Sequence, residues 1–218
     1  MAEEDEHRSE PSVRDDYEVG RFLALSDGVF AIAMTLLVLG LPVPKLIHET
    51  DRDLLAALQK LEPNAAAFAL SFILVGLYWA NHRRFLRGLV RTDGTLLILN
   101  LLILLLVCVV PFTAGVLSLH GQLTTAVVLY ASNLVLLGLA NTALQVHTWR
   151  GRLVASVPGR RERAEALTLS LVGAAVFAVS IPVAFLSPTR AEQGWLVLAL
   201  VGPALRLAPR LRRRLGRR

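Results

Sequence analysis

Six long apolar stretches constrain what this chain of 218 residues can fold into. A transmembrane helix needs about 20 mostly apolar residues, because it rises about 1.5 Å per residue across about 30 Å of hydrocarbon. The chain is 54% hydrophobic and only 18% charged, whereas soluble domains carry about 25% charged residues. The sequence therefore predicts an all-α membrane protein with six transmembrane helices, at about residues 22–41, 64–81, 95–117, 123–146, 165–187 and 194–208.

The distribution of lysine and arginine predicts how these helices are oriented. The connections after the second and fourth stretches and the C-terminal end of the chain from Arg206 onward together carry sixteen Lys and Arg residues, whereas the alternate connections carry four. Lys and Arg accumulate on the cytoplasmic side of a membrane. We therefore expect both termini to be cytoplasmic.

The two ends of the chain differ sharply in charge. Residues 1–20 hold eight acidic residues and two Arg, which is too polar a composition to offset the entropy of ordering, so a disordered acidic cytosolic head is predicted. Residues 209–218 contain six Arg and no acid, which predicts a basic cytosolic tail against anionic lipid headgroups. Because no aromatic residues are interleaved with these arginines, they do not favour nucleic-acid binding. Residues 21–208 are left as the transmembrane domain.

The longest outer connection, residues 46–61, carries apolar residues at the spacing of one helix face. It predicts either a short amphipathic helix on the outer interface or an ordinary solvated connector. The apolar residues are Leu54, Leu55, Leu58 and Leu61.

Few residues in the chain could carry catalysis or hold a metal. The single cysteine, Cys108, excludes an internal disulfide and a cysteine-based zinc site. The five histidines show no paired ligand spacing, so we expect no metal and no cofactor. Only Asp27 and His82 are available as an acid and a base, so an enzyme is not favoured.

Ser26 and Asp27 are polar residues inside the apolar first stretch. A carboxylate within a membrane span is costly, so it usually faces a protein interior or a water-filled cavity. Arg21 lies at the cytoplasmic end, six residues before Asp27, which does not place the two on one helix face. We therefore expect the partners of Asp27 on other helices or subunits, in either a functional site or a packing network.

Trp79 and His82 share a face near the cytoplasmic end of the second stretch. Their depth matches that of Asp27 in the oppositely directed first stretch, so a charge-assisted contact between His82 and Asp27 is a reasonable expectation. Trp79 is also typical of the aromatic belt at a membrane interface.

Beyond Asp27 the first stretch carries an apolar stripe, with Ile32, Leu36 and Leu39 along one side. Such a stripe is usually core or lipid contact, but it would form a hydrophobic constriction if several copies met around an axis. Thr35 would then offer a hydroxyl to a passing ion. Small residues on the same helix would permit close approach, namely Ala24, Gly28 and Ala31.

Three motifs resemble one known family. The run that begins at Arg21 and continues through Leu25, Ser26, Asp27 and Gly28 resembles the RxxxFSDG signature of the transmembrane-protein-175 family, which comprises potassium channels of endosomes and lysosomes and shorter prokaryotic relatives. SFxxxxxYWxxHxxF at 71–85 and NLxxLxxVxxxPFT at 100–113 are also similar to that family.

The resemblance implies a prokaryotic member with one six-helix repeat, a homotetramer in the plasma membrane that conducts potassium passively. It implies a central pore lined by the first helix, with Ile32, Leu36 and Leu39 as the constriction and Thr35 as the position linked to potassium preference. It also implies a signature network of Arg21, Ser26, Asp27, Trp79 and His82.

The chain departs from the family pattern at two positions. Leu25 replaces the usual Phe, which should loosen local packing while keeping an apolar contact, and Gly40 stands where many relatives carry an acid, which should weaken cation attraction at the outer mouth.

Two other functions remain open from the residues. One is a proton- or cation-coupled secondary transporter that uses Asp27 and His82, although no internal repeat of the kind such carriers use is visible. The other is a noncatalytic scaffold whose basic tail recruits partners.

Overall fold

The computed structural model describes residues 13–46 and 48–195, and this part of the chain is a bundle of long helices. Five of them are long and apolar enough to cross a membrane, as the sequence predicts. They are α1 (Val13–Leu36), which continues into the 3-10 turn η1 (Leu37–Gly40), α3 (Glu62–Leu86), α4 (Gly94–His120), α5 (Thr124–Arg150) and α6 (Arg160–Leu186).

The predicted sixth transmembrane helix, residues 194–208, lies almost entirely outside the described residues. The chain is helical over residues 188–195, where the description ends. The basic tail and residues 1–12 of the acidic head are also outside it.

The helices extend beyond the predicted apolar stretches at the end that carries the arginines. Helix α3 runs five residues past the predicted end, to Leu86, and α6 begins at Arg160 rather than at 165. Helix α1 begins at Val13, within the residues that the sequence predicts as an acidic head. Hydropathy detects only the part of a helix that lies in hydrocarbon, whereas the backbone hydrogen bonds continue into the charged turns.

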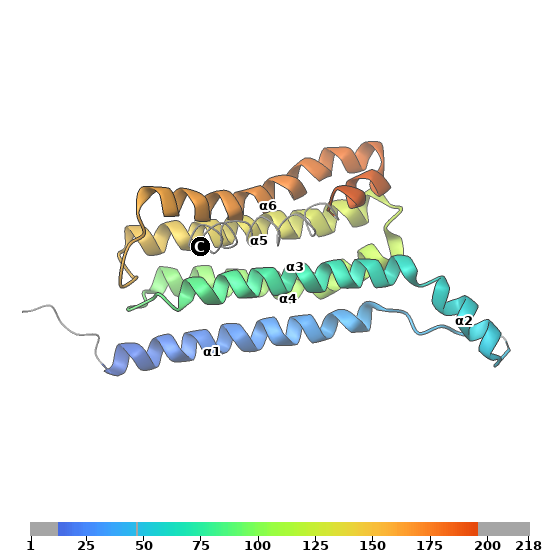
Figure 1. Cartoon of the computed structure of the whole chain (residues 1–218), viewed down its shortest axis with the longest axis horizontal. Coiled ribbons are helices and arrows are strands. Elements are labelled where there is room, and N and C mark those ends of the chain that lie inside the picture. Colours follow the sequence, from blue (N-terminus) through green and yellow to red (C-terminus); the bar gives the residue numbers. More distant parts are fainter. Residues whose placement is uncertain (1–12, 47, 196–218) are drawn as a thin grey trace, which may run out of the picture.

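The helices pack in successive layers (Figure 1). Helix α1 packs against α3 and α4, α4 also packs against α5, and α6 covers α5 on the side of the bundle opposite α1. The core includes Phe30 of α1, Val75 of α3, Val107 of α4 and Leu134 of α5, all fully buried.

The arginine-rich connections lie together at one end of the bundle, where α1 also begins (Figure 1). The α3–α4 and α5–α6 connections pair through a short antiparallel bridge, in which the Val90 N–H donates to the Leu153 carbonyl at 2.9 Å. Asp93 caps α4 by accepting from the Leu96 N–H at 2.7 Å, and its carboxylate also contacts His147 of α5 at 2.9 Å. The hydrogen bond from the Leu96 N–H holds the pKa of Asp93 below its usual value, and the contact with His147 lowers this pKa to a smaller extent.

A short helix in the outer connection, α2 (Asp51–Gln59), confirms the helical alternative for residues 46–61. The Thr50 hydroxyl caps it by accepting from the Asp53 N–H at 3.2 Å. Leu54, Leu55 and Leu58 are all exposed, so the apolar face of α2 is uncovered in the chain.

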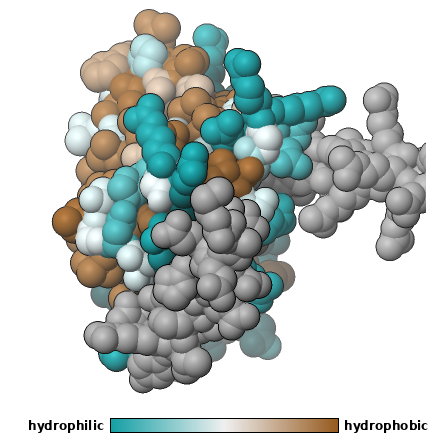
Figure 2. Space-filling view, turned by 90° about the vertical axis from the view of Figure 1, so that its left-hand side faces the viewer, coloured by the Kyte–Doolittle hydropathy of each residue, from teal (hydrophilic) through white to brown (hydrophobic). Residues whose placement is uncertain are grey.

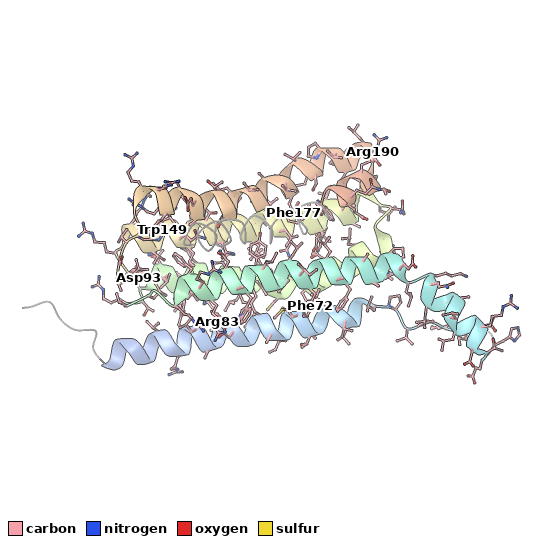
Figure 3. All side chains as sticks on the ribbon, viewed as in Figure 1. Phe72, Arg83, Asp93, Trp149, Phe177 and Arg190 are labelled. Carbon is pink, nitrogen blue, oxygen red and sulfur yellow. The ribbon has the colours of Figure 1, made fainter. Side chains whose placement is uncertain are left out.

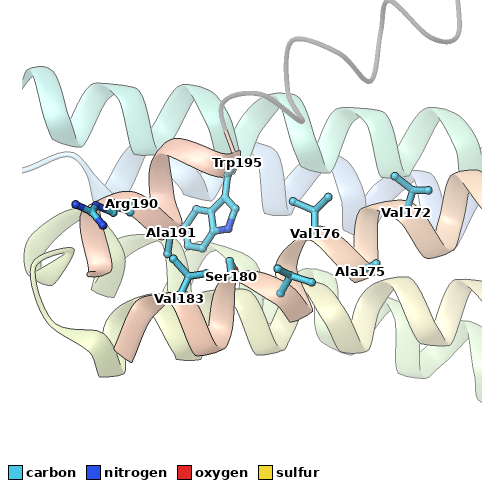
Figure 4. Close-up of a pocket in the computed structure, with 10 residues that line it drawn as sticks. Val172, Ala175, Val176, Ser180, Val183, Arg190, Ala191 and Trp195 are labelled. Atoms are coloured by element: carbon cyan, nitrogen blue, oxygen red, sulfur yellow. The ribbon is translucent and has the colours of Figure 1, made fainter. Parts of the chain in front are cut away.

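Aromatic side chains join α5 and α6 to the short helical segment that follows α6. The ring of Trp195 lies 5.3 Å from that of Tyr130 and 5.5 Å from that of Phe177. The Tyr130 hydroxyl also pairs with Ser71 of α3 at 2.9 Å. Beside Trp195, α6 bears an open apolar recess of about 370 Å³ whose walls include Val176 and Val183 (Figure 4).

Gly138 of α5 permits the closest approach between α5 and α6. A Cβ atom at this position would lie 2.8 Å from the Ala174 Cβ, closer than real Cβ contacts. Small residues at helix interfaces allow this kind of packing in membranes.

We predict that Gly138→Ala destabilises the protein, because overpacking costs about 1–3 kcal/mol and outweighs the 0.5–1 kcal/mol that alanine contributes to a helix interior. The matched control is Gly173→Ala on α6, where the nearest atom, the Tyr78 hydroxyl, would be 3.9 Å from the new Cβ. Thermal unfolding in detergent should give a lower midpoint for Gly138→Ala only. An unchanged midpoint would contradict the tight contact.

Candidate functional site

Helix α1 turns one face to the bundle and leaves the opposite face uncovered. Its buried residues follow helical spacing, with Phe22, Ser26, Phe30, Ala33 and Leu37 on one side. The predicted stripe lies on the other side, where Ile32 is 61% exposed and Leu39 is 76% exposed. Leu36 and Thr35 are exposed as well, so the four residues predicted to line a pore share the uncovered face.

Small residues continue this uncovered face toward the N-terminal end of α1. Ala24, Gly28 and Ala31 are exposed, and a Cβ at Gly28 would meet no atom within 4 Å. Leu25 is 47% exposed, so about half of its surface is uncovered on this face. The face therefore offers a smooth strip to which another helix could come close.

A buried hydrogen-bond network joins the inner face of α1 to α3 and α4. The Asn100 Nδ2 of α4 donates to the Ser26 Oγ at 3.1 Å, and the Ser26 hydroxyl in turn donates to the Phe22 carbonyl at 3.1 Å. The Nε2 of His82 lies 3.0 Å from the Asn100 Oδ1. Because a carboxamide oxygen only accepts, His82 donates from Nε2, which assigns its proton to that nitrogen.

The three network residues are almost completely excluded from solvent, with Asn100 at 0% and both Ser26 and His82 at 2% exposure. The His82 ring also lies 5.5 Å from the ring of Phe30. Its Nδ1 is buried and has no hydrogen-bond partner among the described residues. Buried polar groups of this kind are costly when unpaired. The hydrogen bonds among Ser26, Asn100 and His82 therefore favour the one arrangement of α1, α3 and α4 in which they can form.

Asp27 belongs to a second, more exposed network. Its Oδ1 accepts from the Trp79 Nε1 at 2.7 Å, and its Oδ2 lies 3.5 Å from the Arg83 Nε. The Arg83 guanidinium lies over the Trp79 ring, 5.3 Å from its centroid, a geometry that favours a cation–π interaction. Figure 3 shows Arg83 between α3 and α1, so α3 supplies both partners of the carboxylate.

The structure thus divides the predicted signature residues between two networks. The expectation that Asp27 has partners on another helix is confirmed, but the hydrogen bond expected between His82 and Asp27 is replaced by separate bonds to Asn100 and Trp79. Arg21 lies exposed near the start of the membrane-spanning part of α1. Because Asp27 and His82 belong to different networks, they make no direct contact through which they could share a proton. The transporter hypothesis needs such a contact.

Sequence reasoning missed two functional partners, Asn100 and Arg83. Asn100 was visible as an amide in an apolar stretch and as the first residue of a family-like motif. Arg83 was counted among the charges of the connection after the second apolar stretch, although α3 continues through it to Leu86. The signal for Arg83 was its position four residues after Trp79, on the same helix face.

Thr35 uses its hydroxyl hydrogen within α1, because its Oγ1 donates to the Ile32 carbonyl at 2.8 Å. The oxygen lone pairs remain available on the uncovered face. Because its hydrogen is engaged, this hydroxyl presents only its oxygen, which can accept a hydrogen bond or contact a cation. A permeant cation needs an oxygen of this kind.

At the end of the bundle opposite the arginine-rich connections, α1, η1 and α4 border an open groove of about 540 Å³. Leu36, Leu39 and Gly40 form one wall, and Pro111 and Phe112 of α4 belong to the other. Among the described residues, no group of three or more His, Cys, Asp or Glu side chains could hold a metal ion.

Comparison with known proteins identifies what this arrangement resembles. The profile of the family described as endosomal/lysosomal potassium channel TMEM175 matches residues 21–111. A protein named potassium channel B446_29190, from Streptomyces collinus, is 35% identical over 189 residues, which cover 83% of this chain and 90% of that protein. Potassium channel Cha6605_3372, from Chamaesiphon minutus, is 33% identical over 78% of this chain and 86% of its own length.

A solved structure has the same fold. The crystal structure of a lysosomal potassium-selective channel TMEM175 homolog from Chamaesiphon minutus superposes with a TM-score of 0.75 at 32% identity. The match covers 87% of this chain and 98% of the other.

We predict that Asn100→Leu lowers the stability of the protein by about 1–3 kcal/mol, because the buried His82 Nε2–H is left unpaired, while Ser26 keeps its hydrogen bond to the Phe22 carbonyl. Leu keeps the branching of Asn and removes its hydrogen-bonding atoms, and the same change of residue in the control matches the gain in volume. The control is Asn64→Leu, which removes an amide that donates to the Ser118 carbonyl at 2.7 Å from a half-buried position. Unfolding midpoints in detergent should fall further for Asn100→Leu, and equal shifts would contradict a special role for the buried network.

Proposed function

Because this chain belongs to the TMEM175 family, a family of channels rather than enzymes, we propose that it is a potassium-permeable channel with a pore lined by α1. Its bacterial relatives are named potassium channels, which supports potassium as the permeant ion. The single observation that carries the pore assignment is the uncovered apolar stripe of Ile32 and Leu36 on α1 and Leu39 on η1. The prokaryotic plasma membrane is the proposed location.

The proposed pore needs several copies of the chain, because the uncovered face of one straight helix cannot enclose an ion path. We propose a homotetramer with α1 at its central axis. The strip of Ala24, Gly28 and Ala31 supports this arrangement, since it would let neighbouring α1 helices approach closely. The outer groove beside Leu36 and Leu39 leaves room for side chains of an adjacent copy.

In the proposed mechanism the stripe is both the barrier and the gate. Rings of Ile32, Leu36 and Leu39 exclude water when the four helices are close, and a hydrophobic constriction that dewets does not conduct. Widening the ring admits water and with it a partly hydrated cation. Thr35 lies between Ile32 and Leu36 along the chain, so its hydroxyl oxygen replaces part of the lost hydration.

The two polar networks have a positioning role in this proposal. Asp27, bound to Trp79 and Arg83, ties the middle of α1 to α3, and Ser26 ties it to Asn100 of α4. These contacts hold the rotation of α1 about its axis, and that rotation decides which residues face the pore. The carboxylate of Asp27 therefore positions the pore helix and does not itself carry protons.

We predict that Ile32→Asn and Leu36→Asn each raise potassium flux several-fold in liposomes with a potassium gradient, because an amide in the ring keeps the constriction hydrated. The matched control is Val179→Asn on α6, since Val179 is 65% exposed and Ile32 61%. The control should leave flux unchanged. A protein without flux, or equal effects at both sites, would rule out the α1 pore.

The tetramer is tested by cross-linking. In a Cys108→Ala background, Ile32→Cys should form disulfide-linked dimers on mild oxidation in membranes, because neighbouring copies bring this position together at the axis. Val179→Cys is the control and should remain monomeric on a denaturing gel. The reverse pattern, or a monomeric mass for the native particle, would contradict the fourfold arrangement.

A further inference from the structure

We propose that a groove between the end of α5 and the start of α6 binds the headgroup of an anionic phospholipid. The groove has a volume of about 420 Å³ and lies open at the arginine-rich end of the bundle. Helix α5 contributes Trp149 and Arg150, and α6 contributes Arg160 and Arg163. This site is distinct from the α1 face and from the pore proposed there.

The three arginines are not neutralised by the protein. The guanidinium groups of Arg150, Arg160 and Arg163 form no ion pair or hydrogen bond with any of the residues described. The nearby carboxylates of α6 are already engaged. Glu165 pairs with Arg161 at 3.4 Å, and Glu162 accepts from the Gly159 N–H at 3.2 Å. Three arginines therefore border one open groove without a counter-ion among the described residues, and a phosphate diester complements their charge.

The remainder of the lining is apolar, which favours a lipid over a free phosphate ion. Val146, Ala164 and Leu167 lie along the groove beside the arginines. Trp149 is 7% exposed and is held by an edge-to-face contact with Phe85, with the ring centroids 6.1 Å apart. A phosphate ion would use only the charged part, whereas a phospholipid places its phosphate on the arginines and its glycerol and first methylene groups on the apolar wall.

The location of the groove fits the depth of a headgroup. Trp149 lies near Asp93 at one end of the bundle, and α6 lies on the side opposite α1 (Figures 1 and 3). Seen from this end, hydrophilic side chains project from a molecule whose flanks are apolar (Figure 2). Basic pockets between transmembrane helices at the cytoplasmic interface are suited to anionic headgroups.

The test is native mass spectrometry of the full-length protein titrated with phosphatidylglycerol or phosphatidylcholine of equal chain length. The wild type should bind phosphatidylglycerol more tightly than phosphatidylcholine. The triple variant Arg150→Gln, Arg160→Gln, Arg163→Gln should lose about fivefold in phosphatidylglycerol affinity per arginine. If the triple variant does not fold, Arg163→Gln alone should show the single fivefold loss.

The matched control removes three arginines outside the groove lining at the same end of the molecule, as Arg84→Gln, Arg87→Gln and Arg91→Gln. It should keep the wild-type preference, because the same total charge is lost without change to the groove. An equal loss in the control, or no headgroup preference in the wild type, overturns the proposal. Displacement of the lipid by millimolar inorganic phosphate also overturns it, because the groove would then be a free-anion site. Potassium flux is not a readout here, so a failed pore assignment leaves this test intact.

Discussion

The hydrogen bonds among Ser26, Asn100 and His82 determine how α1 sits on the bundle, and the rest of the site depends on them. Hydrophobicity cannot select the inner face of this helix, because Phe30 on one side and Ile32 on the other are both strongly apolar. In a bilayer either side would be accepted by lipid. Polar groups that find partners in only one rotation make the choice, since an unpaired group in hydrocarbon costs several kcal/mol.

Sequence patterns predicted the transmembrane part of the fold well, because bilayer thickness imposes a length that hydropathy can detect. The boundaries were less accurate at the arginine-bearing ends, as α3 and α6 show. The same ends hold Arg83, which hydropathy assigns to a connection and the backbone assigns to a helix. Helix continuation there depends on capping and on pairing between connections, such as the Val90–Leu153 hydrogen bond, and local composition does not encode that pairing.

The candidate site was predictable in its residue types and less so in its pairings. Ser26, Asp27, Trp79 and His82 stood out because polar side chains are costly inside apolar stretches. Which of them touch depends on the relative rotation and depth of α1, α3 and α4, which one sequence does not specify. Asn100 shows the point, because its amide satisfies both Ser26 and His82 and leaves Asp27 to a different pair of partners on α3.

The pairing of Asp27 with Arg83 also bears on how α1 responds to an electric field. A transmembrane voltage exerts a force on each charge within the membrane. Because the two groups carry opposite charges and lie 3.5 Å apart, the forces on them nearly cancel when the pair is taken as one unit. The two opposed forces leave only a small tendency for α1 and α3 to slide past each other along their contact. In this position the Asp27 carboxylate adds polarity to the spanning helix, while the pair that it forms with Arg83 carries little net charge.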